Sequence, residues 1–532
     1  MLNLAVMLED SARRHPDRVA VVCGDERITY TELDVRAALV AGMLTARGIR
    51  PGDAVALSCP NIAEFVAIYF GILKAGAVVV PLNILLKPRE IAYHLDDSGA
   101  KVYLCFEGTS ALPMGADGWD GRTSSTGRPD MVVITADPNA PSPIPGTMTL
   151  TQAITEHRDV PHDTVSRAPD DTAVILYTSG TTGKPKGAEL THANMVLNAL
   201  TANRQFDNDP SRPDTFLVTL PLFHSFGQTV MMNSGLSVGA TLVLVPRFAA
   251  ADALDLMLVE NVTVFAGVPT MYWALLAELD IPGTVDAVDV ARIAATMRCA
   301  ISGGSALPAD ILERFEQRMG ILIREGYGLS ETSPLALFGD PERPPRPGSV
   351  GVPVWGVQAR LIDSEGRIVE GPSEIGELVL RGHNVMKGYL GRPDATAATM
   401  TEGGWFRTGD LARRDHDGFY YIVDRSKDLI VRGGFNVYPR EIEEVLSSHP
   451  AVSLAAVVSV HDERHGEEVA AVVVCADGAH VTEDELIDWC RGQMAAYKYP
   501  RSIAFTTELP MTATGKILKR ELKVPSRAGT AG

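Results

Sequence analysis

The sequence predicts an α/β fold, because apolar strand-like runs alternate with helical segments along most of the chain. Strands that alternate with helices in this way form largely parallel sheets. The clearest runs are AVALSC, AVVVPL, KVYLCF, TFLVTL, ATLVLV and VTVFAGV. Residues 107–170 interrupt the pattern with Gly, Pro, Ser and Asp, so irregular surface loops are predicted there.

The character of the chain changes twice toward its C-terminus. From about residue 345, the runs GVQARLID, EGRIV, IGELVLRG and GFYYIVD predict a small β module of short strands joined by turns. After the charged stretch DRSKD at 424–428, helices and strands alternate again in a compact unit. We therefore predict a large N-terminal domain over 1–424, containing the β module at about 345–424, and a small C-terminal domain over 425–532.

The size and charge of the chain limit its function. With 532 residues, the usual size of about 150 residues per domain indicates three or four domain-sized units. The formal charge of −18 disfavours nonspecific binding to nucleic acid or anionic lipid, which needs basic surface. Any bound anion must therefore meet locally placed cations.

Cysteine usage and the chain ends predict a reduced, cytoplasmic protein. The six cysteines have no CxxC spacing, which argues against a disulfide framework and against a zinc site. The first residues lack the pattern of a signal peptide, and SRAGTAG at the end carries no peroxisomal or lipidation signal. The most apolar stretch, 65–86, is broken by Lys74, two glycines and Pro81, so it predicts a buried helix, a turn and a strand rather than a membrane span.

The stretch YTSGTTGKPKG at 177–187 has the composition of a phosphate-binding loop. Glycines allow close backbone approach, hydroxyls and N–H groups donate hydrogen bonds, and lysines add charge. Its spacing is not that of a Walker A loop, because Gly180 and Gly183 are only three positions apart and Pro185 follows Lys184. TAVILY before it predicts a strand and LTHANMVLNAL after it predicts a helix, an arrangement that binds phosphate. A solvated surface turn has a similar composition.

Other motifs are ambiguous when each is taken alone. PLFHSFG places His224 after a strand, where open α/β sheets bind ligands, although a lone histidine is more often structural. ISGGSALP offers either close backbone approach or a tight turn before a helix. GYGLSET lacks the last glycine of a hydrolase elbow. HDERH at 461–465, without a third ligand nearby, favours solvated surface over a metal site.

Six motifs in order resemble the core motifs of the ANL superfamily of adenylate-forming enzymes. They are YTSGTTGKPKG, PLFHSFG, GYGLSET, RTGD, DRSKDLIVRGGFNVYPREIE and PMTATGKILKREL, and the resemblance covers nearly the whole chain. EGYGLSETSPL and FAGVPTMYWALL look most like acyl-CoA synthetases that act on fatty acids. The resemblance implies doubly wound sheets with a small β-barrel module, and a small, mobile α+β C-terminal domain. It also implies that ATP and a carboxylic acid form acyl-AMP and pyrophosphate, after which CoA displaces AMP.

The resemblance assigns residues to the nucleotide site. The loop for the β- and γ-phosphates consists of Thr178, Ser179, Gly180, Thr181, Thr182, Gly183 and Lys184. Glu331 is expected to bind Mg²⁺, which carboxylates and phosphate oxygens typically hold. Tyr327 is expected to stack on adenine, Asp410 to accept from the ribose hydroxyls, and Arg425 to contact ribose or phosphate. The remaining nucleotide-binding residues are Gly303, Gly304, Ser305, Gly328 and Thr332.

The resemblance also implies an alternating geometry. Lys516 would bridge the substrate carboxylate and the α-phosphate, and so stabilise charge in the transition state. His224 would be a gate or polar contact for the acid rather than a base. Lys427 takes the hinge position, and the loop Gly433, Gly434 and Phe435 would shape the CoA channel. Without the resemblance, Lys516 reads as a solvated residue near a loose tail.

The substrate and the acceptor are less defined by the sequence. The segments expected to line the acyl pocket are HSFGQTVMMNSGL, FAGVPTMYWALL and SPLALF. They contain no Arg or Lys to pair with a second carboxylate and no Asp to meet an amino group, which disfavours dicarboxylic and amino acid substrates. Medium- or long-chain fatty acids are the leading interpretation, and aromatic acids are second. A ligase that loads a carrier protein, a luciferase-like oxygenase and a non-catalytic binding protein are alternatives. The sequence leaves the oligomeric state open, a homodimer included.

Overall fold

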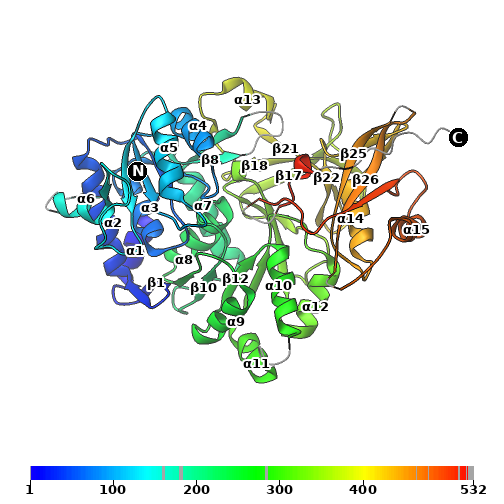
Figure 1. The fold of residues 1–532 in the computed structure, drawn as a ribbon, viewed down its shortest axis with the longest axis horizontal. Helices are drawn as coiled ribbons and strands as arrows, with labels where there is room; N and C mark the ends of the chain where they lie inside the picture. The colour runs from blue at the N-terminus through cyan, green and yellow to red at the C-terminus, as the bar shows by residue number, and fades with distance from the viewer. Residues whose placement is uncertain are drawn as a thin grey trace.

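The structure is a computed structural model that describes residues 2–158, 162–178, 184–281, 286–462, 464–476, 478–512, 516–522 and 524. In Figure 1 the N-terminal elements lie at the left, residues of about 250–320 at the bottom, and the C-terminal strands and helices at the right. Four sheets organise the described residues, two of them large and two of five strands.

The first large sheet has the strand order β19-β9-β8-β4-β3-β5-β6-β7. Its strands from β8 to β7 in this order run parallel, whereas β9 pairs antiparallel with both of its neighbours, β8 and β19. The buried runs AVALS and VVVP are continuous and apolar, as expected for parallel strands covered on both faces. Its strands are β3 (Ala54–Ser58), β4 (Val78–Pro81), β5 (Val102–Phe106), β6 (Asp130–Ile134), β7 (Met148–Thr149), β8 (Thr172–Thr178), β9 (Lys186–Thr191) and β19 (Gly388–Tyr389).

The second large sheet has the order β16-β15-β14-β13-β12-β10-β11-β1-β2, with parallel strands from β14 to β1 in this order and antiparallel edges. The predicted runs TFLVTL, ATLVLV and VTVFAGV form three of its central strands. Its strands are β1 (Val19–Cys23), β2 (Glu26–Thr29), β10 (Thr215–Val218), β11 (Thr241–Leu244), β12 (Val264–Gly267), β13 (Cys299–Ser302), β14 (Ile323–Gly328), β15 (Leu335–Phe338) and β16 (Val352–Pro353).

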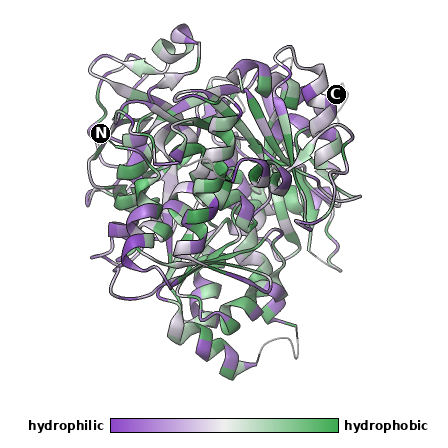
Figure 2. Cartoon of the chain, turned by 90° about the vertical axis from the view of Figure 1, so that its left-hand side faces the viewer, coloured by the Kyte–Doolittle hydropathy of each residue, from purple (hydrophilic) through white to green (hydrophobic). Residues whose placement is uncertain are grey.

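Helices cover both large sheets, and one hydrophobic core joins residues of the two. Figure 2 shows hydrophobic residues gathered along the strands. Thr29 and Glu32 form a capping box that begins α2, and Thr191 and Asn194 form one that begins α7. The helices of this part are α1 (Val6–Arg14), α2 (Tyr30–Ala46), α3 (Ala63–Lys74), α4 (Pro88–Ser98), α5 (Met114–Ser124), α6 (Leu150–Glu156), α7 (His192–Gln205), the π-helix η1 (Phe226–Asn233), α8 (Ser234–Ser237), α9 (Ala250–Val259), α10 (Pro269–Leu279), α11 (Ala287–Thr296), α12 (Ala309–Met319), the 3₁₀ turn η2 (Ser330–Thr332) and α13 (Pro393–Ala398).

The prediction of irregular loops over 107–170 is wrong. This segment contains α5, β6, β7 and α6, and its strands extend the first large sheet. The glycines of α5 serve close packing: a Cβ on Gly118 would lie 2.9 Å from Cys105 Sγ, and one on Gly121 would lie 2.7 Å from Ile91 Cβ. Glycines that allow a helix to approach its neighbours closely have the same composition as glycines in loops, which explains the error.

The β module and the C-terminal unit each form a five-stranded sheet. The first, with the order β17-β18-β21-β20 and β22 beside β21, is antiparallel and agrees with the predicted module. The second has the order β24-β23-β26-β25, with β27 paired to β26. The elements are β17 (Val357–Ile362), β18 (Ile375–Gly382), β20 (Met400–Thr401), β21 (Trp405–Arg414), β22 (Tyr420–Arg425), β23 (Ile430–Arg432), β24 (Phe435–Val437), α14 (Pro439–Ser447), β25 (Val452–Asp462), β26 (Gly466–Cys475), α15 (Glu483–Gln493), β27 (Ser502–Phe505) and η3 (Lys519–Glu521).

The stretch 65–86 folds as predicted, with α3 followed by a turn and the buried strand β4. Among the described residues, no helix is long and apolar enough to cross a membrane.

Candidate active site

The glycine-rich loop connects two antiparallel strands. Thr178 pairs with Lys186 in the β8–β9 ladder, and α7 begins only at His192, after β9. The predicted strand–loop–helix arrangement is therefore wrong, because the short run KGAELT forms a strand before the helix. Ser179, Gly180, Thr181, Thr182 and Gly183 lie outside the described residues. Lys184 is exposed, and its Nζ lies 5.4 Å from the centroid of the Tyr93 ring.

Tyr327, Asp410 and Arg425 meet where the second large sheet faces the β module. Tyr327 Oη donates a hydrogen bond to Asp410 Oδ2 across 2.5 Å, and Arg425 Nε lies 3.4 Å from Asp410 Oδ1. Burial raises the pKa of Asp410, while Arg425 and the Tyr327 hydroxyl oppose this shift by stabilising the carboxylate. These three predicted nucleotide-binding residues are thus brought together as one hydrogen-bonded and charged group.

The glycines near Tyr327 allow close backbone contacts. A Cβ on Gly328 would lie 1.7 Å from Pro334 O, so a side chain there is excluded. Gly303 is buried, and a Cβ on it would lie 3.1 Å from the Phe226 ring. Gly304 has φ +83° and is exposed, as is Ser305. The turn after β13 thus presents backbone and a hydroxyl, without bulky side chains, beside Phe226.

Lys516 lies within electrostatic range of this group. The segment that presents it folds back on itself, with a bridge between Met511 and Ile517 and a 3.1 Å hydrogen bond from Lys516 N to Thr512 Oγ1. The pKa of Lys516 is lowered to about 8, chiefly by burial and then by the positive charge of Arg425, while Asp410 opposes the shift. Lys516 is therefore partly buried and electrostatically coupled to this group, which differs from the solvated residue that the sequence alone suggests.

His224 lies close enough to Lys516 for the charge of the lysine to affect its pKa. Burial lowers the pKa of His224 to about 4, and the charge of Lys516 contributes. The Phe226 N–H donates to His224 Nδ1 across 3.3 Å, which fixes the ring at the start of η1. The imidazole is therefore neutral near pH 7, as the prediction of a polar contact requires.

Glu331 and Thr332 lie on η2 and have different contacts. Tyr389 Oη donates to Glu331 Oε1 across 2.9 Å, and the Lys186 ammonium lies 5.1 Å from the centroid of the Tyr389 ring. The neutral phenol orients the carboxylate without neutralising it, so Glu331 suits a divalent cation. Thr332 is fully buried, and its hydroxyl contacts the backbone at Leu329 and Pro334. Its hydroxyl therefore stabilises the turn in this structure, and its contact with the nucleotide stays a prediction.

The predicted CoA loop has no described contact with Lys516. Gly433 and Gly434 form the turn between β23 and β24 with φ of +56° and +85°. Phe435 is 57% exposed and stacks on Tyr497, with ring centroids 4.7 Å apart. Among the contacts of the described residues, none joins this hairpin to Lys516. Lys427 is exposed, close enough to Lys516 for its charge to lower that residue's pKa.

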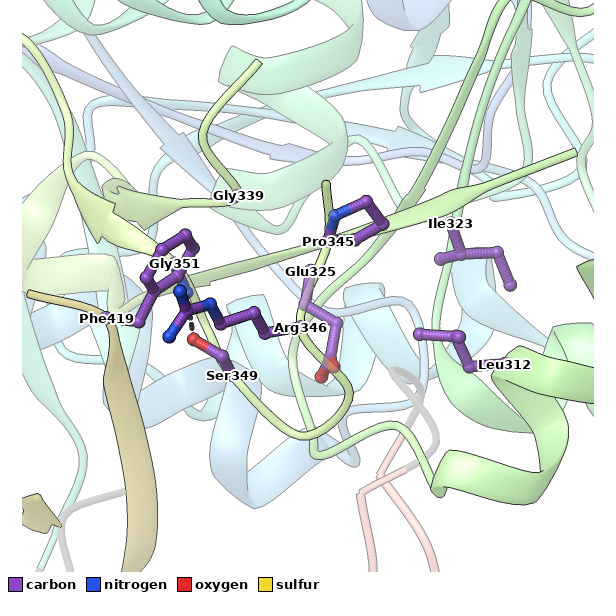
Figure 3. Close-up of a pocket in the computed structure, with 9 residues that line it drawn as sticks. All are labelled: Leu312, Ile323, Glu325, Gly339, Pro345, Arg346, Ser349, Gly351 and Phe419. Atoms are coloured by element: carbon purple, nitrogen blue, oxygen red, sulfur yellow. Dashed lines mark hydrogen bonds between the residues drawn. The ribbon is translucent and has the colours of Figure 1, made fainter. Parts of the chain in front are cut away.

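A small cavity lies behind β14, two residues before Tyr327. Figure 3 shows Glu325, Arg346, Leu312 and Phe419 among the side chains that line it. Its volume of about 10 Å³ is no more than one water needs, which excludes a nucleotide or an acyl chain. Burial raises the pKa of Glu325 to about 7. The cavity is therefore a packing defect around a buried carboxyl.

In the HDERH stretch, His461 and Asp462 end β25, and His465 lies directly before β26. The expectation that no third ligand lies nearby is wrong, because ligand atoms of Asp462, His465 and Glu468 all lie within 4.8 Å of one another. Arg432 Nε donates to Glu468 Oε1 across 2.6 Å, so the carboxylate of Glu468 is already paired with a guanidinium.

The sequence motifs do not identify Tyr389 or the residues that lie beside the ends of the glycine-rich loop. Tyr93, Tyr177, Asp97 and Arg392 form a connected set of hydrogen bonds beside Lys184. Arg392 and Asp97 are 295 positions apart in the sequence, so no local motif announces the pair. Tyr177 begins the motif YTSGTTGKPKG but carries no phosphate-binding signal of its own.

Comparisons with known proteins give a consistent family. Residues 8–390 match the family model described as AMP-binding enzyme, and 441–516 match that of the AMP-binding enzyme C-terminal domain. The chain is 38% identical over 517 residues to a feruloyl-CoA synthase of Amycolatopsis sp, covering 96% of each. It is 34% identical over 543 residues to a long-chain-fatty-acid–CoA ligase of Bacillus subtilis, covering 98% of this chain and 94% of the relative. Its structure is similar to ATP-bound MatB from Rhodopseudomonas palustris, with TM-score 0.87, 33% identity and 98% of each chain covered; against apo MatB the TM-score is 0.77.

Proposed function

The chain belongs to the AMP-binding enzyme family, and we propose that within this family it joins a medium- or long-chain fatty acid to CoA. Its relatives are AMP-forming acid–thiol ligases, and it is an enzyme of this class, with ATP, CoA and a carboxylic acid as substrates. The proposal concerns the identity of the acid and the roles of individual residues.

The cluster around Lys516 supports the first half-reaction. In the proposed step, a substrate carboxylate oxygen attacks the α-phosphorus of ATP, an acyl–phosphate bond forms, and the bond to pyrophosphate breaks. Lys516 lies among Arg425 and Asp410, so its ammonium is placed to attract both the carboxylate and the α-phosphate. Asp410 and Tyr327 are proposed to bind ribose and adenine.

The second half-reaction needs no protein nucleophile. The thiol of CoA attacks the acyl carbonyl of acyl-AMP, a thioester forms, and AMP leaves with the bonding electron pair. Among the described residues, the hairpin around Phe435, which is the proposed CoA loop, has no contact with Lys516. We therefore propose that the C-terminal domain, 425–532, rotates about Lys427 between the two steps, with the domain boundary where the sequence predicts it.

The Mg²⁺ that the family typically uses has a suitable ligand in Glu331. Its carboxylate is oriented by the neutral Tyr389 phenol and carries the charge that a hard cation prefers. When bound, the ion would screen the negative charge of the phosphates. The proposed role of Tyr389 is to orient the Glu331 carboxylate toward the ion.

One observation carries the choice of a hydrophobic acid. The segments 224–236, 265–276 and 333–338, which the resemblance expects to line the acyl pocket, contain no Arg, Lys, Asp or Glu, and Met231 and Met232 of η1 are fully buried. A second carboxylate or an ammonium group would be buried there without a counter-ion, at high cost. An uncharged chain has no such penalty.

A hydroxycinnamic acid is the second candidate for the substrate. The similarity to the feruloyl-CoA synthase, at 38% identity, favours it, and an aromatic acid meets the same requirement for an uncharged acyl group. The acceptor has an alternative as well, since a carrier-protein ligase would share the adenylation site.

The test is a comparison of kcat/KM for pyrophosphate release among decanoate, palmitate, benzoate and ferulate. We expect the highest values for the fatty acids, and thioester formation with free CoA. A kcat/KM for ferulate above those of both fatty acids establishes the second candidate. Transfer to a holo-carrier protein without transfer to CoA contradicts the proposed acceptor. Release of ADP in place of AMP contradicts the proposed chemistry.

A further inference from the structure

Helix α4 is tied by side chains to both ends of the glycine-rich loop. Tyr177, which precedes Thr178, donates from Oη to Asp97 Oδ2 across 2.9 Å. Tyr93 donates from Oη to the carbonyl oxygen of Pro185 across 2.7 Å. Asp97 and Tyr93 lie one turn apart on α4, on the same side of the helix. One face of α4 therefore holds the residue before the loop and the residue after Lys184.

Arg392 completes this arrangement from a distant part of the chain. Its Nη2 donates to Tyr93 Oη at 3.0 Å and to Asp97 Oδ1 at 2.5 Å. Tyr93 Oη has one hydrogen and two acceptors within reach, Pro185 O at 2.7 Å and Asp97 Oδ1 at 3.3 Å. The shorter contact takes the hydrogen, so a lone pair of the hydroxyl is available to the guanidinium. Asp97 accepts from Tyr177 on one oxygen and from Arg392 on the other. The donors and acceptors thus match without conflict.

Lys184 depends on this group for its position. The β8–β9 ladder ends at the pair Thr178 and Lys186, so Lys184 lies beyond the last paired residue. Its ammonium lies over the Tyr93 ring, with 5.4 Å between Nζ and the ring centroid. A ring face attracts an ammonium group at this distance. Tyr93 therefore contacts the loop twice, through its hydroxyl at Pro185 and through its ring at Lys184.

We propose that Tyr93, Asp97 and Arg392 are positioning residues that hold the ends of the loop and Lys184 ready for the terminal phosphates of ATP. This inference rests on the proposed function, in which the loop binds the β- and γ-phosphates. The chain carries a net charge of −18, so a polyphosphate must be met by a few cations held in place. Groups that are fixed before binding lose less conformational entropy when the ligand arrives.

The test uses two products of the first step that occupy different parts of the site. Pyrophosphate probes the loop, whereas AMP probes the Tyr327 and Asp410 region. Tyr93→Phe keeps the ring over Lys184 but removes the hydroxyl. We expect inhibition by pyrophosphate to weaken about five-fold and KM for ATP to rise similarly, the effect of losing one hydrogen bond. Inhibition by AMP and KM for the acid stay unchanged.

Asp97→Asn tests the carboxylate, and Arg392→Gln tests the same contact from outside α4 if Asp97→Asn fails to fold. Both should weaken pyrophosphate inhibition and spare AMP. Tyr421→Phe is the matched control, because Tyr421 Oη also bonds a carboxylate, Asp415, at 3.1 Å, away from the loop. It should change neither inhibition constant.

Two results overturn the inference. One is unchanged pyrophosphate inhibition in Tyr93→Phe and Arg392→Gln. The other is an equal loss of pyrophosphate and AMP binding, which indicates general loosening of the site. Failure of the proposed function is a separate result: the wild-type enzyme would then release no pyrophosphate with any acid tested.

Discussion

Tyr327 Oη donates a 2.5 Å hydrogen bond to Asp410 Oδ2, and this bond joins the second large sheet to the β module. Asp410 lies on β21 directly opposite Arg425 on β22, in register within the β module. The carboxylate therefore has one neutral and one charged partner from two different elements. A nucleotide that contacts Asp410 would meet an acceptor already held in a fixed orientation.

The first prediction concerns this carboxylate. Asp410→Asn keeps the shape of the side chain and an acceptor for Tyr327, but removes the charge. Hydrogen bonds to charged groups contribute about 1.5–3 kcal/mol, so inhibition by AMP should weaken by about 10- to 100-fold. Competition with ATP measures this change. An unchanged inhibition constant would exclude Asp410 from the ribose site.

The second prediction concerns Glu331 and Tyr389. Glu331→Gln removes the charge that holds Mg²⁺, so the half-saturating Mg²⁺ concentration for pyrophosphate release should rise about ten-fold or more. Tyr389→Phe removes only the 2.9 Å donor to Glu331 and should move the concentration in the same direction by a smaller factor. Circular dichroism and thermal unfolding check that both variants remain folded. If Mg²⁺ titrations of both variants match wild type, Glu331 does not bind the metal.

The third prediction concerns pH. The pKa of Lys516 is lowered to about 8, and its charged form is the one that attracts the carboxylate and the α-phosphate. The kcat/KM for adenylation should therefore fall as pH rises through about 8, toward a ten-fold loss per unit. Lys516→Arg keeps its charge throughout this range, because arginine has a pKa above about 12. Its profile should lack the alkaline limb, whatever its absolute rate.

A profile for Lys516→Arg with the same limb would assign that limb to another group. His224 does not account for it, because its pKa is lowered to about 4, so it stays neutral on both sides of pH 8. Lys427 is the alternative, and Lys427→Arg distinguishes the two.

Much of the fold was predictable because its signals are local. Continuous apolar runs such as VVVP and TFLV identify buried parallel strands without knowledge of their neighbours. The errors come from residues with two physical uses. By composition, the glycines of 107–170 predict loops, yet Gly118 and Gly121 allow α5 to pack closely. The run KGAELT is too short to be distinguished from a loop by its sequence.

The site was predictable to the extent that its residues lie in ordered motifs. Lys516, Asp410 and Tyr327 come from three such motifs, and the structure brings them together. Tyr389 and Arg392 could not be found in this way, since their roles depend on contacts with Glu331 and Asp97, both remote in sequence. Such pairs become visible only when the sheets and helices are assembled.

The final prediction separates the two half-reactions. Lys516→Ala should slow adenylation by about 10²- to 10³-fold, the usual effect of losing one preorganised electrostatic contact. Thioester formation from supplied acyl-AMP should survive, because that step does not use the lysine. Lys427→Pro should have the opposite effect, since proline fixes φ near −65° and restricts rotation at the hinge. Adenylation should persist in that variant while CoA transfer fails.

The structure gives this prediction a physical basis. Lys516 lies beside Asp410 and Arg425, whereas the exposed Phe435 stacks on Tyr497 and has no described contact with that cluster. Both groups belong to the predicted C-terminal domain, 425–532, so if the Phe435 hairpin shapes the CoA channel as proposed, we expect this domain to move and Lys516 to leave before the thioester forms. Single-turnover rates of both steps in both variants decide the matter: equal losses in the two steps for each variant would mean that one fixed geometry serves both reactions and that Lys427 is not a hinge.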